Sequence, residues 1–200
     1  MAASTFNLEQ TTISSIRSLP PDTYLIHATN CIAEWGAGIA AELALVFPAA
    51  YTEYKRFCIA AKTDESAPWP PQTLAGRCLI IPSQHADVAA GAPRIHIVCV
   101  FTSYGYGRPN KKTGKPGKDN IGKILVQTLS SLKELRVQLE AKAAEAGNSQ
   151  GEKLESDIVI YSPMFNSGAF QVPWEKTTAL IHKAFTCWGG RWLVMEPPSK

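Results

Sequence analysis

Short apolar runs of β type alternate along the chain with longer stretches that carry apolar residues at helical spacing. Runs rich in Val, Ile and aromatic residues predict strands, and a period of about 3.6 residues predicts helices. The predicted strands cover residues 24–27, 78–81, 95–101, 157–161 and 192–195. The predicted helices cover residues 38–47, 51–61, 121–146 and 174–185. This alternation favours an α/β fold, in which helices cover both faces of a mostly parallel, mixed central sheet.

Two polar segments connect the later elements. Residues 105–119 hold four glycines, two prolines and four lysines, which predicts a mobile basic loop. Its lysines at 111, 112, 115 and 118 could steer an anionic substrate, although a solvated linker is the simpler interpretation. Residues 147–155 form a polar connector. A chain of 200 residues is the size of one α/β domain, so we expect a single domain over residues 1–200.

Composition and charge narrow the class of ligand. The net charge of +3 suits a phosphorylated small molecule, but it falls short of the dense basic face that a duplex nucleic acid requires. Five cysteines without a C-x-x-C pair indicate a reducing compartment. The first residues lack a signal-peptide pattern, and no apolar run has the length of a membrane span. We therefore expect a cytoplasmic or nuclear protein without a membrane or nucleic-acid partner.

A glycine-rich loop follows the first predicted strand. In Trp35-Gly36-Ala37-Gly38-Ile39-Ala40, the near absence of side chains lets a ligand approach the backbone closely. The helix that begins here offers unpaired amides and the positive end of its dipole, which together favour a phosphate. The alternative is a glycine turn that only tightens the helix onto the sheet.

A second loop of small residues, Asn166-Ser167-Gly168-Ala169-Phe170, also lies between a predicted strand and a predicted helix. In parallel sheets such loops meet beyond the carboxyl ends of the strands. Two of them at one rim fit a diphosphate held between them. Phe170 could stack on a ribose or a base, although a lone Phe is more often part of a core.

Other phosphate chemistries fit less well. Gly36-x-Gly38-x-x-Ala41 formally matches a dinucleotide-binding fingerprint, but residues 28–35 separate it from the strand and no second strand ends near Ala60. The sequence also lacks a P-loop, a cysteine followed six positions later by arginine, and clustered metal ligands. We therefore expect neither a cofactor nor a metal.

Several blocks of the chain together resemble the macrodomain family, and within it the fungal ADP-ribose 1''-phosphate phosphatases of the yeast Poa type. They occur in the family's order and spacing between about Tyr24 and Met195. The blocks are Leu25-Ile26-His27-Ala28-Thr29-Asn30-Cys31, Trp35-Gly36-Ala37-Gly38-Ile39-Ala40, Phe101-Thr102-Ser103 and Asn166-Ser167-Gly168-Ala169-Phe170-Gln171-Val172-Pro173-Trp174.

This resemblance implies a three-layer α/β/α macrodomain whose cleft holds ADP-ribose. Asn30 would lie beside the distal ribose, and the two loops would surround the diphosphate. The implied ADP-ribose contacts are Thr12, Ile13, Ala28, Thr29, Asn30, Trp35, Gly36, Ala37, Gly38, Ile39, Ala40, Ser103, Asn166, Ser167, Gly168, Ala169 and Phe170.

The resemblance also places His27 at the position of the phosphatases' catalytic histidine. Histidine suits this role because its ordinary pKa lies near neutrality, so it can donate a proton to a leaving oxygen or accept one from water. Of the four histidines, His27 is the one that we expect at the rim of the site. The structural alternative is a core histidine at the end of a strand.

The chain departs from the family in two ways. Macrodomains hold the adenine amine with an acidic residue, or in the phosphatases an asparagine, near the N-terminus, and the nearest counterpart here is Thr11-Thr12-Ile13. The Thr12 hydroxyl or backbone groups would have to replace it. Related glutamate-ADP-ribose hydrolases use a lysine and an aspartate, whereas here residues 101–104 lack the lysine and Phe170 takes the aspartate position.

Three functions follow from the resemblance. The first is an enzyme that hydrolyses the phosphomonoester of ADP-ribose 1''-phosphate, a by-product of tRNA splicing by the family's account. The second is a non-catalytic reader of ADP-ribose or ADP-ribosylated protein. The third is a hydrolase of ADP-ribosyl esters such as the O-acetyl form. The absence of the lysine favours the first two.

Overall fold

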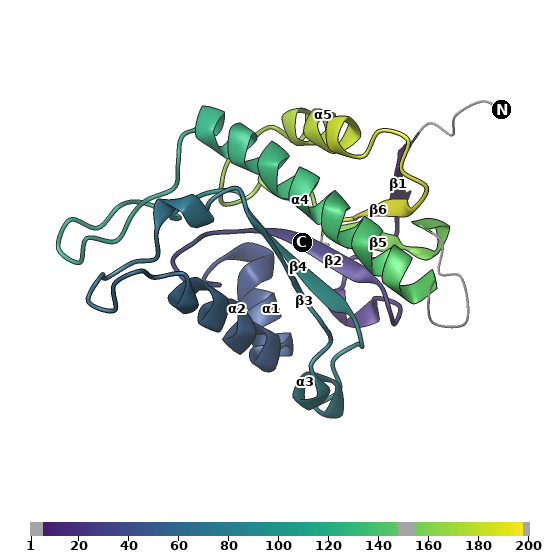
Figure 1. Cartoon of the computed structure of the whole chain (residues 1–200), viewed down its shortest axis with the longest axis horizontal. Coiled ribbons are helices and arrows are strands. Elements are labelled where there is room, and N and C mark those ends of the chain that lie inside the picture. Colours follow the sequence, from purple (N-terminus) through teal and green to yellow (C-terminus); the bar gives the residue numbers. More distant parts are fainter. Residues whose placement is uncertain (1–5, 148–154, 198–200) are drawn as a thin grey trace.

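The computed structural model describes residues 6–147 and 155–197, which form a six-stranded sheet with helices on both faces (Figure 1). The strands are β1 (Leu8–Thr11), β2 (Tyr24–Thr29), β3 (Cys78–Ile81), β4 (His96–Phe101), β5 (Val159–Ser162) and β6 (Arg191–Met195). The helices are α1 (Gly38–Val46), α2 (Pro48–Ala60), α3 (His85–Ala89), α4 (Ile121–Gly147) and α5 (Trp174–Ala184). Short 3-10 helices cover Ile16–Ser18, Gln72–Leu74 and Glu155–Asp157.

The strand order is β1-β6-β5-β2-β4-β3, and every neighbouring pair is parallel except β3 with β4. The predicted mostly parallel, mixed sheet is therefore confirmed. Because β1, β6, β5, β2 and β4 run in one direction, their carboxyl ends lie at the same edge of the sheet. The loops that follow these strands consequently meet at that edge.

Two apolar cores lie on opposite faces of the sheet. Leu25 packs into the core beneath α1 and α2, whereas Ile26 packs into the core beneath α4 and α5. Figure 1 shows α4 and α5 over one face and α1 and α2 over the other. Since side chains alternate along a strand, β2 directs His27 to the same side as Leu25. This alternation decides where the predicted catalytic histidine lies.

The break between α1 and α2 shows how tertiary contacts complete a local signal. Pro48 occupies the first turn of α2, where its missing N–H is not needed. The next two amides, of Ala49 and Ala50, donate to the buried carboxylate of Asp87 at 2.8 and 3.0 Å. Asp87 belongs to α3, so a distant residue caps α2 and sets the position of the first helical layer.

Most predicted elements are confirmed, with several corrections. β1 and α3 were not predicted, because β1 is a short edge strand and α3 is a single short helix. α2 begins at Pro48 instead of residue 51, and β2 continues to Thr29. Part of the predicted polar connector, residues 148–154, lies outside the described residues. Among the described helices, none combines the length and apolar character needed to cross a membrane.

The basic loop 105–119 is held by hydrogen bonds at its base and near its far end. At its base, the amide of Tyr104 donates to Asp119 Oδ2 at 2.8 Å, and the amide of Asp119 donates to Ser103 Oγ at 2.9 Å. At its far end, the amide of Asn110 donates to the carbonyl oxygen of Lys115 at 3.0 Å. Contacts between residues distant in sequence thus fix the loop's path.

Candidate functional site

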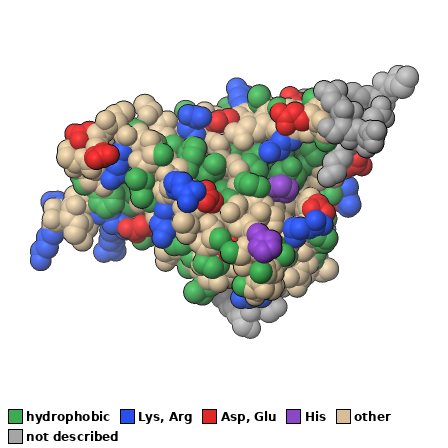
Figure 2. All heavy atoms as spheres, turned by 60° about the horizontal axis from the view of Figure 1, so that its bottom comes forward, with side chains coloured by type: hydrophobic (Ala, Val, Ile, Leu, Met, Phe, Trp, Pro, Cys, Tyr) green, Lys and Arg blue, Asp and Glu red, His purple; other side chains and the backbone are tan. Residues whose placement is uncertain are grey.

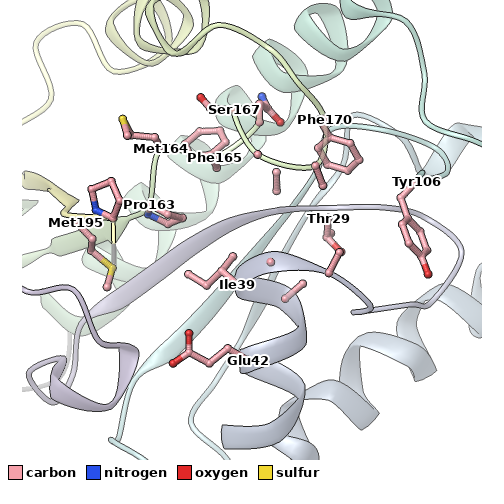
Figure 3. A pocket seen from close by; sticks show the side chains of 18 of the residues that line it. Thr29, Ile39, Glu42, Tyr106, Pro163, Met164, Phe165, Ser167, Phe170 and Met195 are labelled. Carbon is pink, nitrogen blue, oxygen red and sulfur yellow. The ribbon is translucent and has the colours of Figure 1, made fainter. Parts of the chain in front are cut away.

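A cavity of about 590 Å³ opens beyond the carboxyl ends of β2, β5 and β6 (Figure 3). Its volume lies within the usual range for a small-molecule site. The residues that line it are Ser14, Ile16, Ala28, Thr29, Asn30, Glu34, Gly36, Ala37, Gly38, Ile39, Ala40, Glu42, Tyr106, Pro163, Met164, Phe165, Asn166, Ser167, Gly168, Ala169, Phe170, Met195, Glu196 and Pro197.

One wall of the cavity is the glycine-rich loop and the start of α1. The helix begins at Gly38, and no side chain caps it at Ala37. Gly38 has a φ of +54°, a left-handed conformation that favours glycine, and no heavy atom lies within 4 Å of where its Cβ would be. The first amides of α1 and the positive end of its dipole therefore face open space beside this wall. This arrangement suits an anion.

The facing wall is the loop 163–170, which Asn166 holds in place. The buried Asn166 side chain donates to Thr128 Oγ1 at 2.9 Å and accepts from Thr102 Oγ1 at 2.8 Å. Its φ of +67° turns the chain, and its carbonyl oxygen accepts from the amide of Val172 at 2.9 Å. Asn166 thus ties the loop to the residue that follows β4 and to α4, and Gly168 and its neighbours line the cavity with little side-chain bulk.

Asn30 shapes the turn between β2 and the glycine-rich loop. Its Oδ1 accepts from the amide of Ile32 at 3.0 Å and from the Tyr54 hydroxyl at 3.1 Å, and its Nδ2 donates to the carbonyl oxygen of Glu34 at 2.6 Å. The side chain is buried, although the residue lines the cavity. Asn30 therefore holds the backbone that precedes Gly36 in a fixed path.

The two ends of the cavity differ in character. In Figure 3, Pro163 and Met195 lie at one end and Tyr106 lies at the opposite end, near Thr29 and Phe170. The first end is largely apolar and offers a surface for a planar base. The second end carries Glu34 and the phenol of Tyr106 and offers polar groups for a sugar.

Glu34 and Tyr106 form a close pair at the polar end. The Tyr106 hydroxyl donates to Glu34 Oε2 at 2.5 Å. This hydrogen bond, together with burial and the charge of Glu34, raises the pKa of Tyr106 to about 12. Tyr106 therefore stays protonated and remains a donor to Glu34 at neutral pH. A Cβ at Gly36 would lie 2.8 Å from the Tyr106 hydroxyl, so the glycine leaves room for this contact.

The charged side chains that line the cavity are all acidic: Glu34, Glu42 and Glu196. Among the described residues, no Lys or Arg belongs to the lining. An anion in the cavity would consequently depend on backbone amides and the dipole of α1. No group of three or more His, Cys, Asp or Glu side chains suited to a metal ion occurs within residues 6–147 and 155–197.

The sequence interpretation put His27 at the rim of the site, but the structure places it away from the rim. The side chain is fully buried between the sheet and Trp35, with a ring-centroid distance of 5.0 Å to that indole. His27 Nε2 lies 3.6 Å from Cys99 Sγ, and burial lowers the pKa of His27 to about 3. The imidazole is therefore neutral at physiological pH. It matches the alternative of a core histidine, because the alternation of β2 directs it toward the helical layer.

Four other residues expected to contact ADP-ribose do not line the cavity. Trp35 is buried against Tyr51 and Tyr54, and the Ser103 hydroxyl holds the base of the 105–119 loop. Thr12 and Ile13 precede the lining residues instead of belonging to them. The expected residues that the structure does bring together at the cavity are Ala28, Thr29, Asn30, Gly36, Ala37, Gly38, Ile39, Ala40, Asn166, Ser167, Gly168, Ala169 and Phe170.

Other lining residues were not predicted from the sequence. Glu34 and Tyr106 are 72 positions apart, and no local pattern indicates that they meet. Ser14 and Ile16 follow the edge strand β1, and Glu196 follows its neighbour β6; because β1 was not predicted, this end of the site was not recognised. Only the strand order could have indicated that these segments join the cavity.

Solved structures share this fold. The macrodomain of Mycobacterium tuberculosis DarG matches with a TM-score of 0.62 and 18% identity, covering 97% of this chain and 99% of its own. The macrodomain of Thermus aquaticus DarG matches with a TM-score of 0.60 and 16% identity, covering 96% and 99%. Thermosipho africanus DarTG, solved in complex with ADP-ribose, matches with a TM-score of 0.55 and 15% identity, covering 90% of this chain and 39% of its own. The three-layer α/β/α arrangement is thus a macrodomain fold.

Curated relatives define the family more narrowly. The ADP-ribose 1''-phosphate phosphatase of Debaryomyces hansenii is 36% identical over 162 residues, covering 78% of this chain and 80% of the relative. That of Scheffersomyces stipitis is 34% identical over 171 residues, covering 82% and 87%. The chain therefore belongs to the ADP-ribose 1''-phosphate phosphatase family of macrodomains. No protein-family model matches the sequence.

Proposed function

We propose that this protein binds ADP-ribose 1''-phosphate in the cavity and hydrolyses it to ADP-ribose and inorganic phosphate. The observation that carries the proposal is the facing pair of side-chain-poor loops, Gly36–Ala40 at the start of α1 and Ser167–Ala169 after β5. They form a cradle for a diphosphate in a chain whose relatives carry the name of this phosphatase.

The difference between the apolar and the polar end of the cavity sets the orientation of the ligand. The adenine lies at the apolar end near Ile16 and Met195, and the diphosphate lies between the two loops. The distal ribose and its terminal phosphate then point toward Asn30, Glu34 and Tyr106. This orientation places the scissile bond at the polar end, where proton transfer groups are available.

The reaction needs a proton acceptor beside the attacking water. Water attacks the phosphorus and gives a proton to the base, the bond between phosphorus and the ribose oxygen breaks, and the base returns that proton to the leaving oxygen. Glu34 is the carboxylate that lines the polar end, so we assign it the role of general base. Amides at the glycine-rich loop hold the neighbouring diphosphate and thereby position the terminal phosphate beside Glu34.

The resemblance supports a different residue, His27, for the proton transfer. In this structure His27 is fully buried against Trp35 and does not line the cavity, so it does not contact a ligand there. We therefore propose His27 as a positioning residue that supports Trp35 and the glycine-rich loop. Variants of Glu34 and His27 separate the two assignments.

A non-catalytic reader of ADP-ribose or ADP-ribosylated protein is the second candidate. The burial of His27 and its pKa of about 3 favour it, because they remove the family's catalytic group from the site. A reader needs the loop amides and the apolar end of the cavity, but no proton acceptor. Phosphate release and ADP-ribose binding, measured on the same protein, distinguish the two functions.

The decisive experiment measures phosphate release from ADP-ribose 1''-phosphate in the presence of a chelator, together with calorimetric titration of ADP-ribose. If the parent protein releases phosphate and Glu34→Gln lowers that release, the phosphatase function is supported. Binding of ADP-ribose without phosphate release favours the reader, and hydrolysis of O-acetyl-ADP-ribose alone favours the esterase. A protein that neither binds nor hydrolyses refutes the site. Localisation in the cytoplasm or nucleus, and a substrate that arises in tRNA splicing, stay predictions.

A further inference from the structure

The proposed substrate presents a problem of charge. It carries a diphosphate and a terminal phosphate monoester, yet the charged residues of the described lining are Glu34, Glu42 and Glu196. Loop amides at the start of α1 can hold the diphosphate, but the terminal phosphate lies beyond them, beside Glu34. A dianion next to a carboxylate needs a cation nearby. Among the described residues, the lining contains no such cation.

A cation lies next to Tyr106 at the polar end of the cavity. Lys115, from the folded basic loop, places its Nζ 3.7 Å from the centroid of the Tyr106 ring and 3.4 Å from the Tyr106 carbonyl oxygen. Tyr106 lines the cavity and donates its hydroxyl to Glu34 at 2.5 Å. The ammonium, the phenol ring and the carboxylate therefore form one continuous group at the end where the terminal phosphate lies.

The loop holds this lysine in place. The carbonyl oxygen of Lys115 accepts from the amide of Asn110 at 3.0 Å, and the preceding Gly114 carbonyl oxygen accepts from Trp69 Nε1 at 3.0 Å. Lys111 and Lys112 of the same loop are exposed, whereas Lys115 is half-buried. Lys and Arg side chains gather at the end of the molecule that this loop forms (Figures 1 and 2). Within the described chain, Lys115 forms no salt bridge with a carboxylate.

We propose that Lys115 recognises the terminal phosphate of the substrate and thereby distinguishes ADP-ribose 1''-phosphate from ADP-ribose. This inference rests on the proposed function. Lys115 does not itself line the cavity, so its flexible side chain would turn from the Tyr106 ring toward the phosphate, to which the ammonium donates. The product ADP-ribose lacks the phosphate and loses this contact, which favours its release. Lys115 is thus a specificity-determining residue supplied by the basic loop.

The test replaces Lys115 with Gln and compares two ligands that differ only in the terminal phosphate. For ADP-ribose 1''-phosphate, kcat/KM falls about tenfold to a hundredfold, mainly through KM, since a hydrogen bond to a charged group is lost. For ADP-ribose, the Kd from calorimetry changes by less than about twofold, because the lost contact involves the absent phosphate. Lys115→Arg retains most of the parent's preference. Lys111→Gln is the matched control, since it removes the same charge from an exposed site in the same loop.

The outcomes separate this inference from the proposed function. If the parent releases no phosphate, direct titration of both ligands replaces kinetics, and tighter binding of the phosphorylated ligand that Lys115→Gln removes still supports the role of Lys115. Equal weakening of both ligands by Lys115→Gln would show that the lysine only supports the loop. Unchanged kcat/KM and affinity, or an equal effect of Lys111→Gln, would also overturn the proposal.

Discussion

Replacing Gly38 with glutamate tests whether the start of α1 holds the diphosphate. Gly38 lines the cavity with a φ of +54°, and no heavy atom lies within 4 Å of its added Cβ. A side chain there extends into the cavity without colliding with the protein. Left-handed backbone at a residue with a Cβ costs roughly 1–2 kcal/mol, so the fold should survive with a melting temperature lowered by about 2–8 °C.

The effect on binding should be much larger than the effect on stability. A carboxylate about 4 Å from a phosphate experiences a repulsion of about 4 kcal/mol at an effective dielectric constant of about 20, and about 1 kcal/mol in bulk water. The side chain also occupies the space of the diphosphate. We therefore expect Gly38→Glu to lose at least ~3 kcal/mol of binding free energy, or roughly a hundredfold in the Kd of ADP-ribose.

Calorimetric titration with ADP-ribose and a thermal melt of each variant measure these effects. Gly38→Ala adds the backbone strain alone, and Gly38→Gln adds the bulk without the charge. The loss should increase from Ala to Gln to Glu, and the difference between Gln and Glu should shrink as salt rises. A folded Gly38→Glu protein that binds ADP-ribose like the parent would refute the cradle. A loss from Gly38→Ala as large as that from Gly38→Glu would assign the effect to strain.

The remaining predictions concern catalysis, base selection and pH. Glu34→Gln should lower kcat for phosphate release by about a hundredfold to ten-thousandfold, with a larger effect than His27→Gln; the opposite order would return the proton transfer to His27 and require its buried ring to become accessible. ADP-ribose and its inosine counterpart should bind within about tenfold of each other in calorimetry, because no buried carboxylate at the described apolar end is aimed at the adenine amine; a stronger preference would reveal such a group. The pKa of His27 is lowered to about 3, so the unfolded chain binds a proton below pH 6.5 that the folded chain excludes, and stability falls by about 1.4 kcal/mol per pH unit from pH 6.5 toward 3. Urea unfolding of His27→Gln should show a shallower acid-side slope than the parent, and an equal slope would contradict the buried, neutral state.

Local sequence patterns determined most of the elements of this protein. The β-branched runs at 78–81 and 95–101 became β3 and β4, and Pro48 ended α1 where the pattern had indicated a break. The glycine-rich loop before α1 was also readable, because glycines before a helix leave its amides open to a ligand. These signals are local, since hydrogen bonds and side-chain spacing within a few residues generate them.

The tertiary structure decided which of these segments form the site. β1 is a four-residue edge strand whose pairing with β6 brings residues 14–16 to the apolar end, and no local periodicity predicts that pairing. The Glu34–Tyr106 pair joins residues 72 positions apart. His27 has the residue type and sequence position of a catalytic group, but the alternation of β2 buries it beneath Trp35. Sequence determines which chemical groups are present, whereas strand order and side-chain direction determine which of them reach the cavity, because burial depends on packing between distant elements.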